Sequence, residues 1–160
     1  MPALMLLRHA KSDWRADYGH DRDRPLNKRG VRSARAIGRF VERYGLVPDL
    51  VLTSPAVRTA TTADLAAEAG TWKSEIVAVP DLYGAEPNRL LSLIRGLNDV
   101  DRVMVVGHEP TMSGFLGRMT GSHLRVPTAT LTCLRPFYSR WADLGWGTAE
   151  VELYIRPRLL

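Results

Sequence analysis

Cysteine is almost absent from this chain: Cys133 is the only one among 160 residues. A single thiol excludes an intramolecular disulfide, so a reducing compartment is compatible with the sequence. Cys133 lies in the strand-like stretch 131–134, and we therefore expect it to be a small core residue and not a nucleophile.

Long apolar runs are missing as well. No stretch reaches the roughly 18 apolar residues of a membrane span. The run Leu4–Leu7 stops at Arg8, and the first residues lack the basic start and long apolar stretch of a signal peptide. We therefore expect no membrane partner and a cytoplasmic location.

Charge of one sign does not gather in blocks. The net charge is +5, from 22 basic and 17 acidic residues, and mixtures such as residues 21–24 dilute the basic ones. A positive field favours anionic partners such as phosphates. The basic surface has neither interleaved aromatic residues nor a nucleic-acid-binding motif, so we expect no nucleic-acid partner.

What the chain does have is the composition of an ordinary globular domain. Hydrophobic residues make up 45% and charged residues 24%, which excludes a disordered chain. A length of 160 residues suits one domain with a sizeable core. We see no repeat or linker, so residues 1–160 are expected to form a single domain.

Hydrophobic periodicity predicts four strand-then-helix units. The expected strands are 3–7, 50–52, 76–79 and 102–106, and the expected helices are 28–44, 54–69, one that opens at 86–87 and one that starts near 110. Thr53 or Ser54 is expected to cap the second helix, with Pro55 in its first turn. The polar residues 10–28 predict a long loop, and such loops are usually functional.

The end of the chain follows another pattern. Residues 130–134 and 150–155 are strand-like with no helix between them, which predicts an antiparallel hairpin at a sheet edge with 141–147 in its loop. The four preceding units predict an α/β sandwich with a largely parallel sheet. In such sheets, ligands bind beyond the carboxyl ends of the strands, and His9, Arg58 and His108 all fall in that zone.

Two histidines and two arginines near strand ends suit phosphoryl transfer. A nucleophilic histidine must be neutral, with its other ring nitrogen held by a hydrogen bond. Arginines beside His9 would lower its pKa and stabilise charge on the phosphoryl oxygens, which a planar guanidinium binds two at a time. Arg58 could instead be an exposed helix residue, and His108 a capping or buried structural residue.

A metal site is not expected, because no cluster of His, Asp or Glu with ligand spacing accompanies His108. Glu109 follows directly and is expected to point elsewhere. His20 and His123 have no comparable setting, and we expect both to be solvated.

Five segments taken together resemble the histidine phosphatase superfamily, and in particular its short SixA-type branch. They are Leu6–Ser12, Arg24–Gly30, Thr53–Ala60, Leu82–Ala85 and Val106–Pro110. The resemblance covers nearly the whole chain. It implies a three-layer α/β/α sandwich with a mostly parallel central sheet.

The resemblance also implies roles for particular residues. His9 would be phosphorylated, and Arg8, Arg58 and His108 would complete the phosphate pocket, with no cofactor. Arg24 and Asn27 from the second segment are further candidates for substrate binding, although Asn27 also suits the start of the first helix. The chain has Ala10 where the superfamily usually has glycine, a change that is common in the SixA-like branch.

The general acid is the part of the family pattern without a clean match. Asp81 is nearest in order, and Asp13 and Glu86 are alternatives. Because an imidazole leaving group can be protonated on its remote nitrogen, a phosphohistidine substrate needs no strong protein acid. His108 could also serve.

The leading hypothesis is a metal-independent phosphatase that works through phospho-His9 on phosphohistidine in a protein. One alternative is a phosphatase for small phosphomonoesters. The short connection between the third and fourth strands argues against this alternative, because it leaves little room for a cap over a small substrate. The other alternative is a non-catalytic phosphate-binding module.

Overall fold

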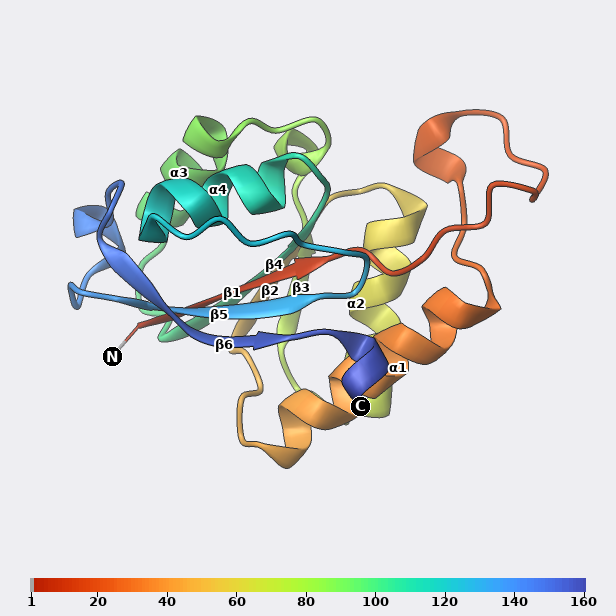
Figure 1. Ribbon diagram of the computed structural model, residues 1–160, viewed down its shortest axis with the longest axis horizontal. Coiled ribbons are helices and arrows are strands. Elements are labelled where there is room, and N and C mark those ends of the chain that lie inside the picture. Colours follow the sequence, from red (N-terminus) through yellow and green to blue (C-terminus); the bar gives the residue numbers. More distant parts are fainter. Residues whose placement is uncertain (1) are drawn as a thin grey trace.

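The computed structural model describes residues 2–160. Within them, one mixed sheet of six strands has the order β3-β2-β4-β1-β5-β6 (Figure 1). Its strands are β1 (Ala3–Arg8), β2 (Leu50–Thr53), β3 (Glu75–Ala78), β4 (Arg102–Gly107), β5 (Leu131–Pro136) and β6 (Ala149–Ile155). The first four run parallel, whereas β5 pairs antiparallel with β1 and β6 antiparallel with β5. The predicted mostly parallel sheet with an antiparallel edge hairpin is confirmed.

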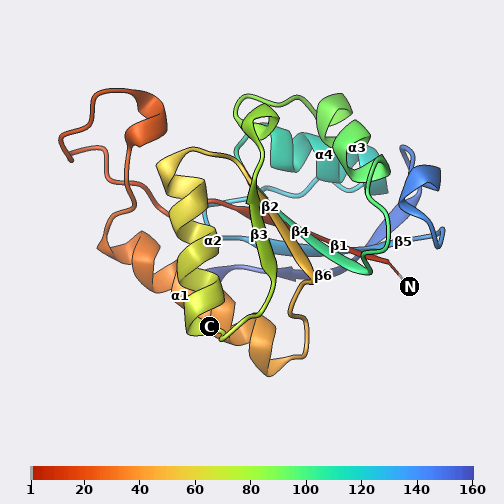
Figure 2. The same ribbon diagram turned by 180° about the vertical axis from the view of Figure 1, so that it is seen from behind.

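Helices cover both faces of this sheet. α1 (Lys28–Arg43) and α2 (Val57–Ala69) lie on one face, and α3 (Pro87–Arg95) and α4 (Thr111–Thr120) on the other (Figures 1 and 2). This is the three-layer α/β/α sandwich that the resemblance implied. Among the described residues, no helix is long and apolar enough to cross a membrane.

The two-sided cover explains the uninterrupted apolar sequence of β1. Successive side chains of a strand point to opposite faces of the sheet. Leu4 and Leu6 therefore pack with α3 and α4 residues in one core, while Met5 and Leu7 pack with α1 and α2 residues in the other. A strand buried on both faces has no polar positions to alternate with.

α1 and α2 pack closely because a glycine lies at their contact. A side chain at Gly38 would place its Cβ about 2.0 Å from the carbonyl oxygen of Ala66, so only glycine allows this approach. α1 begins after Asn27, whose Oδ1 accepts a hydrogen bond of 2.8 Å from the Gly30 N–H. This cap fixes where the loop 10–27 ends.

The start of α2 differs from its prediction. The helix begins at Val57 after Ala56, which makes no side-chain cap hydrogen bond, and neither Thr53 nor Ser54 caps it. The Thr59 hydroxyl instead donates to the carbonyl oxygens of Ser54 and Ala56 from inside the first turn. The prediction was wrong because the helix begins three residues after Ser54. The Ser54 Oγ accepts from the Ala56 N–H at 3.3 Å, before the first turn, and lies 2.8 Å from the His108 Nε2.

The long loop 10–27 is confirmed as mostly irregular. It contains one short 3₁₀ turn, Asp21–Asp23, and an isolated antiparallel bridge between Ser12 and Leu26. The bridge closes the loop near its base, so the 3₁₀ turn extends over the carboxyl edge of the sheet as a separate projection (Figure 1).

Candidate active site

His9 and His108 meet because β1 and β4 are parallel neighbours in the sheet centre. Arg8 is in register with Gly107, so the residue after each strand emerges at the same edge. The His9 N–H donates to the Gly107 carbonyl oxygen at 3.0 Å. The two imidazole rings lie 5.4 Å apart between centroids.

A cavity of about 210 Å³ opens between these rings and the loop, and we call it the histidine cavity. It takes residues from the ends of β1 and β4, the loop 10–27, the first turn of α2 and the segment before β5. Its lining is Arg8, His9, Lys11, Ser12, Trp14, Arg24, Arg58, His108, Glu109 and Thr128. Within residues 2–160, no three His, Cys, Asp or Glu side chains gather in a group that could hold a metal ion.

His9 is nearly buried, with 7% of its surface exposed. Its Nδ1 lies 2.8 Å from the Ala10 carbonyl oxygen, which can only accept, so Nδ1 carries the proton. Nε2 then keeps its lone pair. Burial lowers the pKa of His9 to about 3, and the positive charges of Arg58 and Arg8 contribute. The ring is therefore neutral at pH 7, as a nucleophile must be.

His108 is held from both sides. Its Nε2 lies 2.8 Å from the Ser54 Oγ, and the Tyr83 ring meets it edge-on with 5.7 Å between centroids. Burial is the main cause that lowers the pKa of His108 to about 4, and the Arg58 charge lowers it further. Both histidines of the cavity are thus neutral at pH 7.

The Asp21 side chain contacts two arginines, Arg24 of the loop 10–27 and Arg58 of the first turn of α2. Arg58 donates from Nη1 to the Asp21 carbonyl oxygen at 2.8 Å and from Nη2 to its carboxylate at 3.0 Å. Arg24 donates to the other carboxylate oxygen at 3.0 Å, and the Tyr83 hydroxyl donates at 2.9 Å to the oxygen that also accepts from Arg58. The hydrogen bond from Arg24 is the largest cause that lowers the pKa of Asp21 to about 2. Asp21 therefore stays ionised and orients both guanidinium groups.

Several buried donors of this site have no partner. The N–H of Arg8 Nε, Arg24 Nε and Arg58 Nε and the Nδ1 of His108 make no hydrogen bond within the described chain. A buried donor left unpaired costs roughly 1–3 kcal/mol. Arg8 otherwise donates from Nη1 to the Val126 carbonyl oxygen at 3.0 Å. All four unpaired groups belong to residues that line the histidine cavity, so the cavity suits a ligand rich in acceptors.

The structure brings five of the sequence-predicted residues together: Arg8, His9, Arg24, Arg58 and His108. Asn27 does not line the histidine cavity, and its side chain caps α1. Its predicted part in substrate binding has no contact to support it.

The three candidates for the general acid also lie outside the histidine cavity. Asp81 forms an exposed ion pair with Arg89. The Asp13 carboxylate accepts from the Arg15 N–H at 2.9 Å. Glu86 is exposed and precedes α3 without capping it.

Glu109 is a carboxylate that sequence reasoning set aside. It was expected to point elsewhere, yet it lines the histidine cavity. Its two oxygens accept from the N–H and hydroxyl of Ser113 at 2.8 and 2.7 Å, which turns the side chain back along the start of α4. The serine four positions later was the available signal.

For Ser54, Asp21 and Tyr83, the sequence did not indicate which residues of the site they contact. Asp21 and Asp23 both lie on the 3₁₀ turn before Arg24, and Asp21, three residues before Arg24, is the one that pairs with it. Ser54 and Tyr83 reach His108 from distant parts of the chain. No local sequence signal marks such contacts.

Comparison with known proteins agrees with this geometry. The model of the histidine phosphatase superfamily (branch 1) matches residues 4–83. An uncharacterised protein of Mycobacterium tuberculosis is 34% identical over 95% of this chain and 100% of its own length. A solved structure from Agrobacterium tumefaciens, assigned as phosphohistidine phosphatase SixA, has a TM-score of 0.85 and 32% identity, covering 98% of this chain and 99% of that one.

A second solved structure with the same assignment, from Nakamurella multipartitia, has a TM-score of 0.82 and 31% identity. It covers 98% of this chain and 96% of that one. The family match includes β1 with His9 and α2 with Arg58, and the structural matches extend over β4 and His108 as well. The chain therefore belongs to the histidine phosphatase superfamily, in its SixA-type branch.

Proposed function

We propose that this phosphatase works through a covalent phosphoryl group on His9 and that its substrate is phosphohistidine in a protein. One observation carries the mechanism: a neutral histidine with a free Nε2 lies in a cavity whose arginine N–H groups lack partners. A phosphoryl group supplies several acceptor oxygens and the electrophilic phosphorus in one ligand. Arg8, Arg24 and Arg58 would bind those oxygens.

In the first step, the His9 Nε2 lone pair forms a bond to phosphorus as the bond between phosphorus and the leaving group breaks. The electron pair of that bond goes to the leaving group. Nδ1 keeps its proton and its hydrogen bond to Ala10, so positive charge on the ring is stabilised by a fixed carbonyl dipole. The arginines stabilise the charge on the phosphoryl oxygens in the transition state.

The leaving group decides whether a protein acid is needed. When the substrate is phosphohistidine, the breaking bond is phosphorus to nitrogen, and a proton already on the remote ring nitrogen lets a neutral imidazole leave. This fits a cavity that none of Asp13, Asp81 or Glu86 lines. An alcohol leaving group would need a proton at the cavity. His108 is neutral at pH 7, which leaves Glu109 as the acidic side chain of the lining.

In the second step, water attacks the phosphorus of phospho-His9, the bond to Nε2 breaks, and orthophosphate leaves. The proton of the attacking water passes to a cavity base or to a phosphate oxygen. His108 is neutral at pH 7 because of its lowered pKa, so it can accept that proton.

The choice of a protein substrate rests on the surroundings of the histidine cavity. Between β3 and β4 the chain has only a short 3₁₀ turn and the nine residues of α3, which leaves little material for a cap over a small molecule. Small phosphomonoesters are the second candidate, since the chemistry of His9 does not depend on what carries the phosphate.

A quenched-flow experiment tests the mechanism and the substrate together. The protein, freed of metals by chelation, is mixed with a phosphohistidine peptide, p-nitrophenyl phosphate or a sugar phosphate, each labelled in the phosphoryl group. We expect acid-labile, alkali-stable label on the protein and the highest kcat/KM with the peptide. Absence of protein-bound label would contradict the covalent step. Faster turnover of the sugar phosphate would favour the small-molecule candidate.

A further inference from the structure

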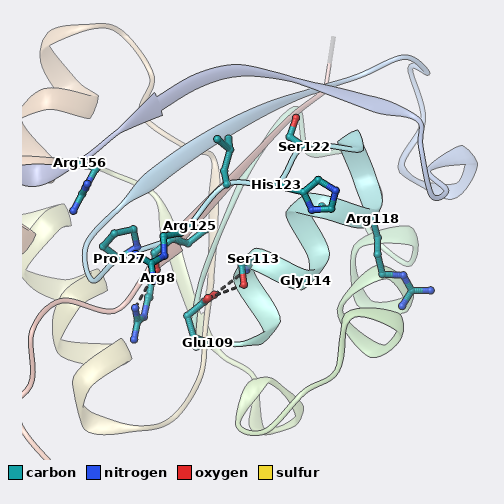
Figure 3. A pocket seen from close by; sticks show the side chains of 13 residues that line it. Arg8, Glu109, Ser113, Gly114, Arg118, Ser122, His123, Arg125, Pro127 and Arg156 are labelled. Carbon is teal, nitrogen blue, oxygen red and sulfur yellow. Dashed lines mark hydrogen bonds between the residues drawn. The ribbon is translucent and has the colours of Figure 1, made fainter.

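A larger groove continues from the histidine cavity. It has a volume of about 880 Å³ and shares Arg8 and Glu109 with that cavity. Figure 3 shows it between α4 and the irregular segment that leads into β5, with Arg156 beyond the end of β6. We call it the arginine groove. Any ligand bound through Arg8 has this space beside it.

The charge of the arginine groove is strongly one-sided. Four arginines line it: Arg8, Arg118, Arg125 and Arg156. Among the described residues that line the groove, Glu109 is the one with a carboxylate. No carboxylate among residues 2–160 pairs with these arginines. Elsewhere on the surface, arginines such as Arg89, Arg135 and Arg140 do have carboxylate partners. Three guanidinium groups of the groove are therefore available to an external anion.

The positions of these charges suit an extended ligand. In Figure 3, Arg156 and Arg118 lie on opposite sides of the groove, with His123 between them. Arg118 rests 3.9 Å from the centre of the Trp146 ring, which holds its guanidinium in place. Because the cations do not converge, one small anion cannot contact all of them.

The backbone of the groove offers further donors. The N–H groups of residues 123–126 donate to no backbone acceptor within the described chain. On α4, Gly117 has no side chain, and a Cβ there would lie 3.4 Å from the carbonyl oxygen of Ser122, which also lines the groove. Free N–H groups beside an open groove are the features that bind an extended peptide through its main chain.

We propose that the arginine groove binds an acidic peptide segment next to the phosphorylated residue of a protein substrate. This inference rests on the proposed function, since the phosphoryl group in the histidine cavity sets where the segment enters. Carboxylates of the segment would pair with Arg118, Arg125 and Arg156, and its main chain would accept from the free N–H groups.

Two phosphohistidine peptides that differ in charge alone test the proposal. One has three glutamates near the phosphohistidine, and the other has three glutamines at the same positions. We expect a kcat/KM ratio of about tenfold in favour of the glutamate peptide, mostly through KM and decreasing with salt. In the triple variant Arg118→Gln, Arg125→Gln, Arg156→Gln, the ratio is expected to approach one.

A matched control removes three exposed cations that do not line the groove: Arg39→Gln, Arg43→Gln, Lys73→Gln. It has the same net charge as the groove variant and should keep the wild-type ratio. An equal decrease of the ratio in both triple variants would mean that overall charge attracts the peptide, and it would overturn the groove as the binding site.

Binding without turnover separates this inference from the proposed function. Fluorescence anisotropy of a labelled, unphosphorylated glutamate peptide is measured with wild type and with both triple variants. Groove-dependent binding without hydrolysis of either phosphopeptide would contradict the phosphohistidine function and leave the groove assignment standing. Hydrolysis of both phosphopeptides at equal kcat/KM would overturn the groove and leave the function standing. Groove-dependent binding of tripolyphosphate without binding of the peptide would overturn a peptide as occupant.

Discussion

The two sides of the histidine cavity hold their functional groups by different means. On the strand side, which comprises Arg8, His9 and His108, main-chain hydrogen bonds fix the residues at the ends of β1 and β4. On the loop side, Arg24 and Arg58 are held by the carboxylate of Asp21. Main-chain positions are insensitive to single substitutions, whereas an ion-pair network depends on each of its members.

This difference separates two contributions to catalysis. The strand side supplies the bond-forming atom, which no other group can replace. The loop side supplies charge, which neighbouring cations can partly replace. We therefore expect large losses of activity from strand-side changes and graded changes from the loop side.

The largest effect is expected from His9→Ala. Removing the nucleophile should lower kcat by about 10⁴-fold or more, since no covalent intermediate can form. Circular dichroism should show an intact fold. The control is His20→Ala, because His20 is an exposed histidine of the loop 10–27 and should be dispensable. Activity of His9→Ala near the wild-type level would show that the strand side does not supply the nucleophile.

Arg58→Ala should have the next largest effect. Loss of a charge-assisted donor to the transition state is expected to lower kcat/KM by about 10²–10³-fold. Arg58→Lys should recover only part of this, because an ammonium cannot bind two oxygens in the arginine geometry. Arg39→Ala, an exposed arginine of α1, serves as control. Near-normal kcat/KM for Arg58→Ala would assign the cation role to Arg24.

Acid pH should destabilise the protein through His9. In the unfolded chain His9 takes up a proton as the pH falls below its ordinary pKa of 6.5, but in the folded chain it does so only near 3. The stability that neutral His9 contributes is thus complete above pH 6.5 and is lost as the pH falls towards 3. Between pH 6.5 and 5 we expect His9 alone to lower the free energy of unfolding by about 2 kcal/mol, and His108, whose pKa is also lowered, adds to the total loss.

Urea unfolding at several pH values measures this loss. The variant His9→Asn has no imidazole at this position and should show a shallower decline over the same range. NMR titration of the imidazole signals should show that neither His9 nor His108 becomes protonated above pH 5, because both pKa values are lowered. An imidazole at position 9 that titrates near 6.5 would contradict the strand-side description.

Asp21→Asn should strengthen anion binding by the loop side, whereas Arg58→Ala weakens it. Without its carboxylate, Arg24 and Arg58 are less neutralised, and orthophosphate should inhibit with a Ki lowered by about 3- to 10-fold. Asp23→Asn, in the same 3₁₀ turn but without these ion pairs, is the control. An increased Ki would show that Asp21 matters more for placing Arg58 than for limiting its charge.

Tyr83→Phe should have the smallest effect. It removes the hydroxyl that donates to Asp21 but keeps the ring beside His108. One exposed hydrogen bond contributes only about 0.5–1.5 kcal/mol, so kcat/KM should change by no more than a few fold. Tyr138→Phe is a control at another exposed tyrosine. A loss comparable to that of Arg58→Ala would place the Tyr83 hydroxyl among the reacting groups.

The same division explains what could be predicted from the sequence. The positions of His9 and His108 follow from the apolar strands before them, because the end of a buried strand fixes the next residue at the sheet edge. The partner of Arg24 and Arg58 did not follow, since Asp21 and Asp23 differ only in how the 3₁₀ turn orients them. Glu109 was misjudged because its direction depends on its hydrogen bonds to Ser113.

The pairing of β1 with β4 has a consequence for folding kinetics. β1 is the first strand to be synthesised, but its parallel neighbour β4 follows only after three helices and two strands, or most of the chain, have been made. Contacts between such distant segments form slowly, because a long loop must close before they can stabilise anything. During synthesis on the ribosome, the nucleophile therefore remains without its second histidine until β4 has emerged. In refolding experiments, recovery of activity should coincide with completion of the sheet and not precede it.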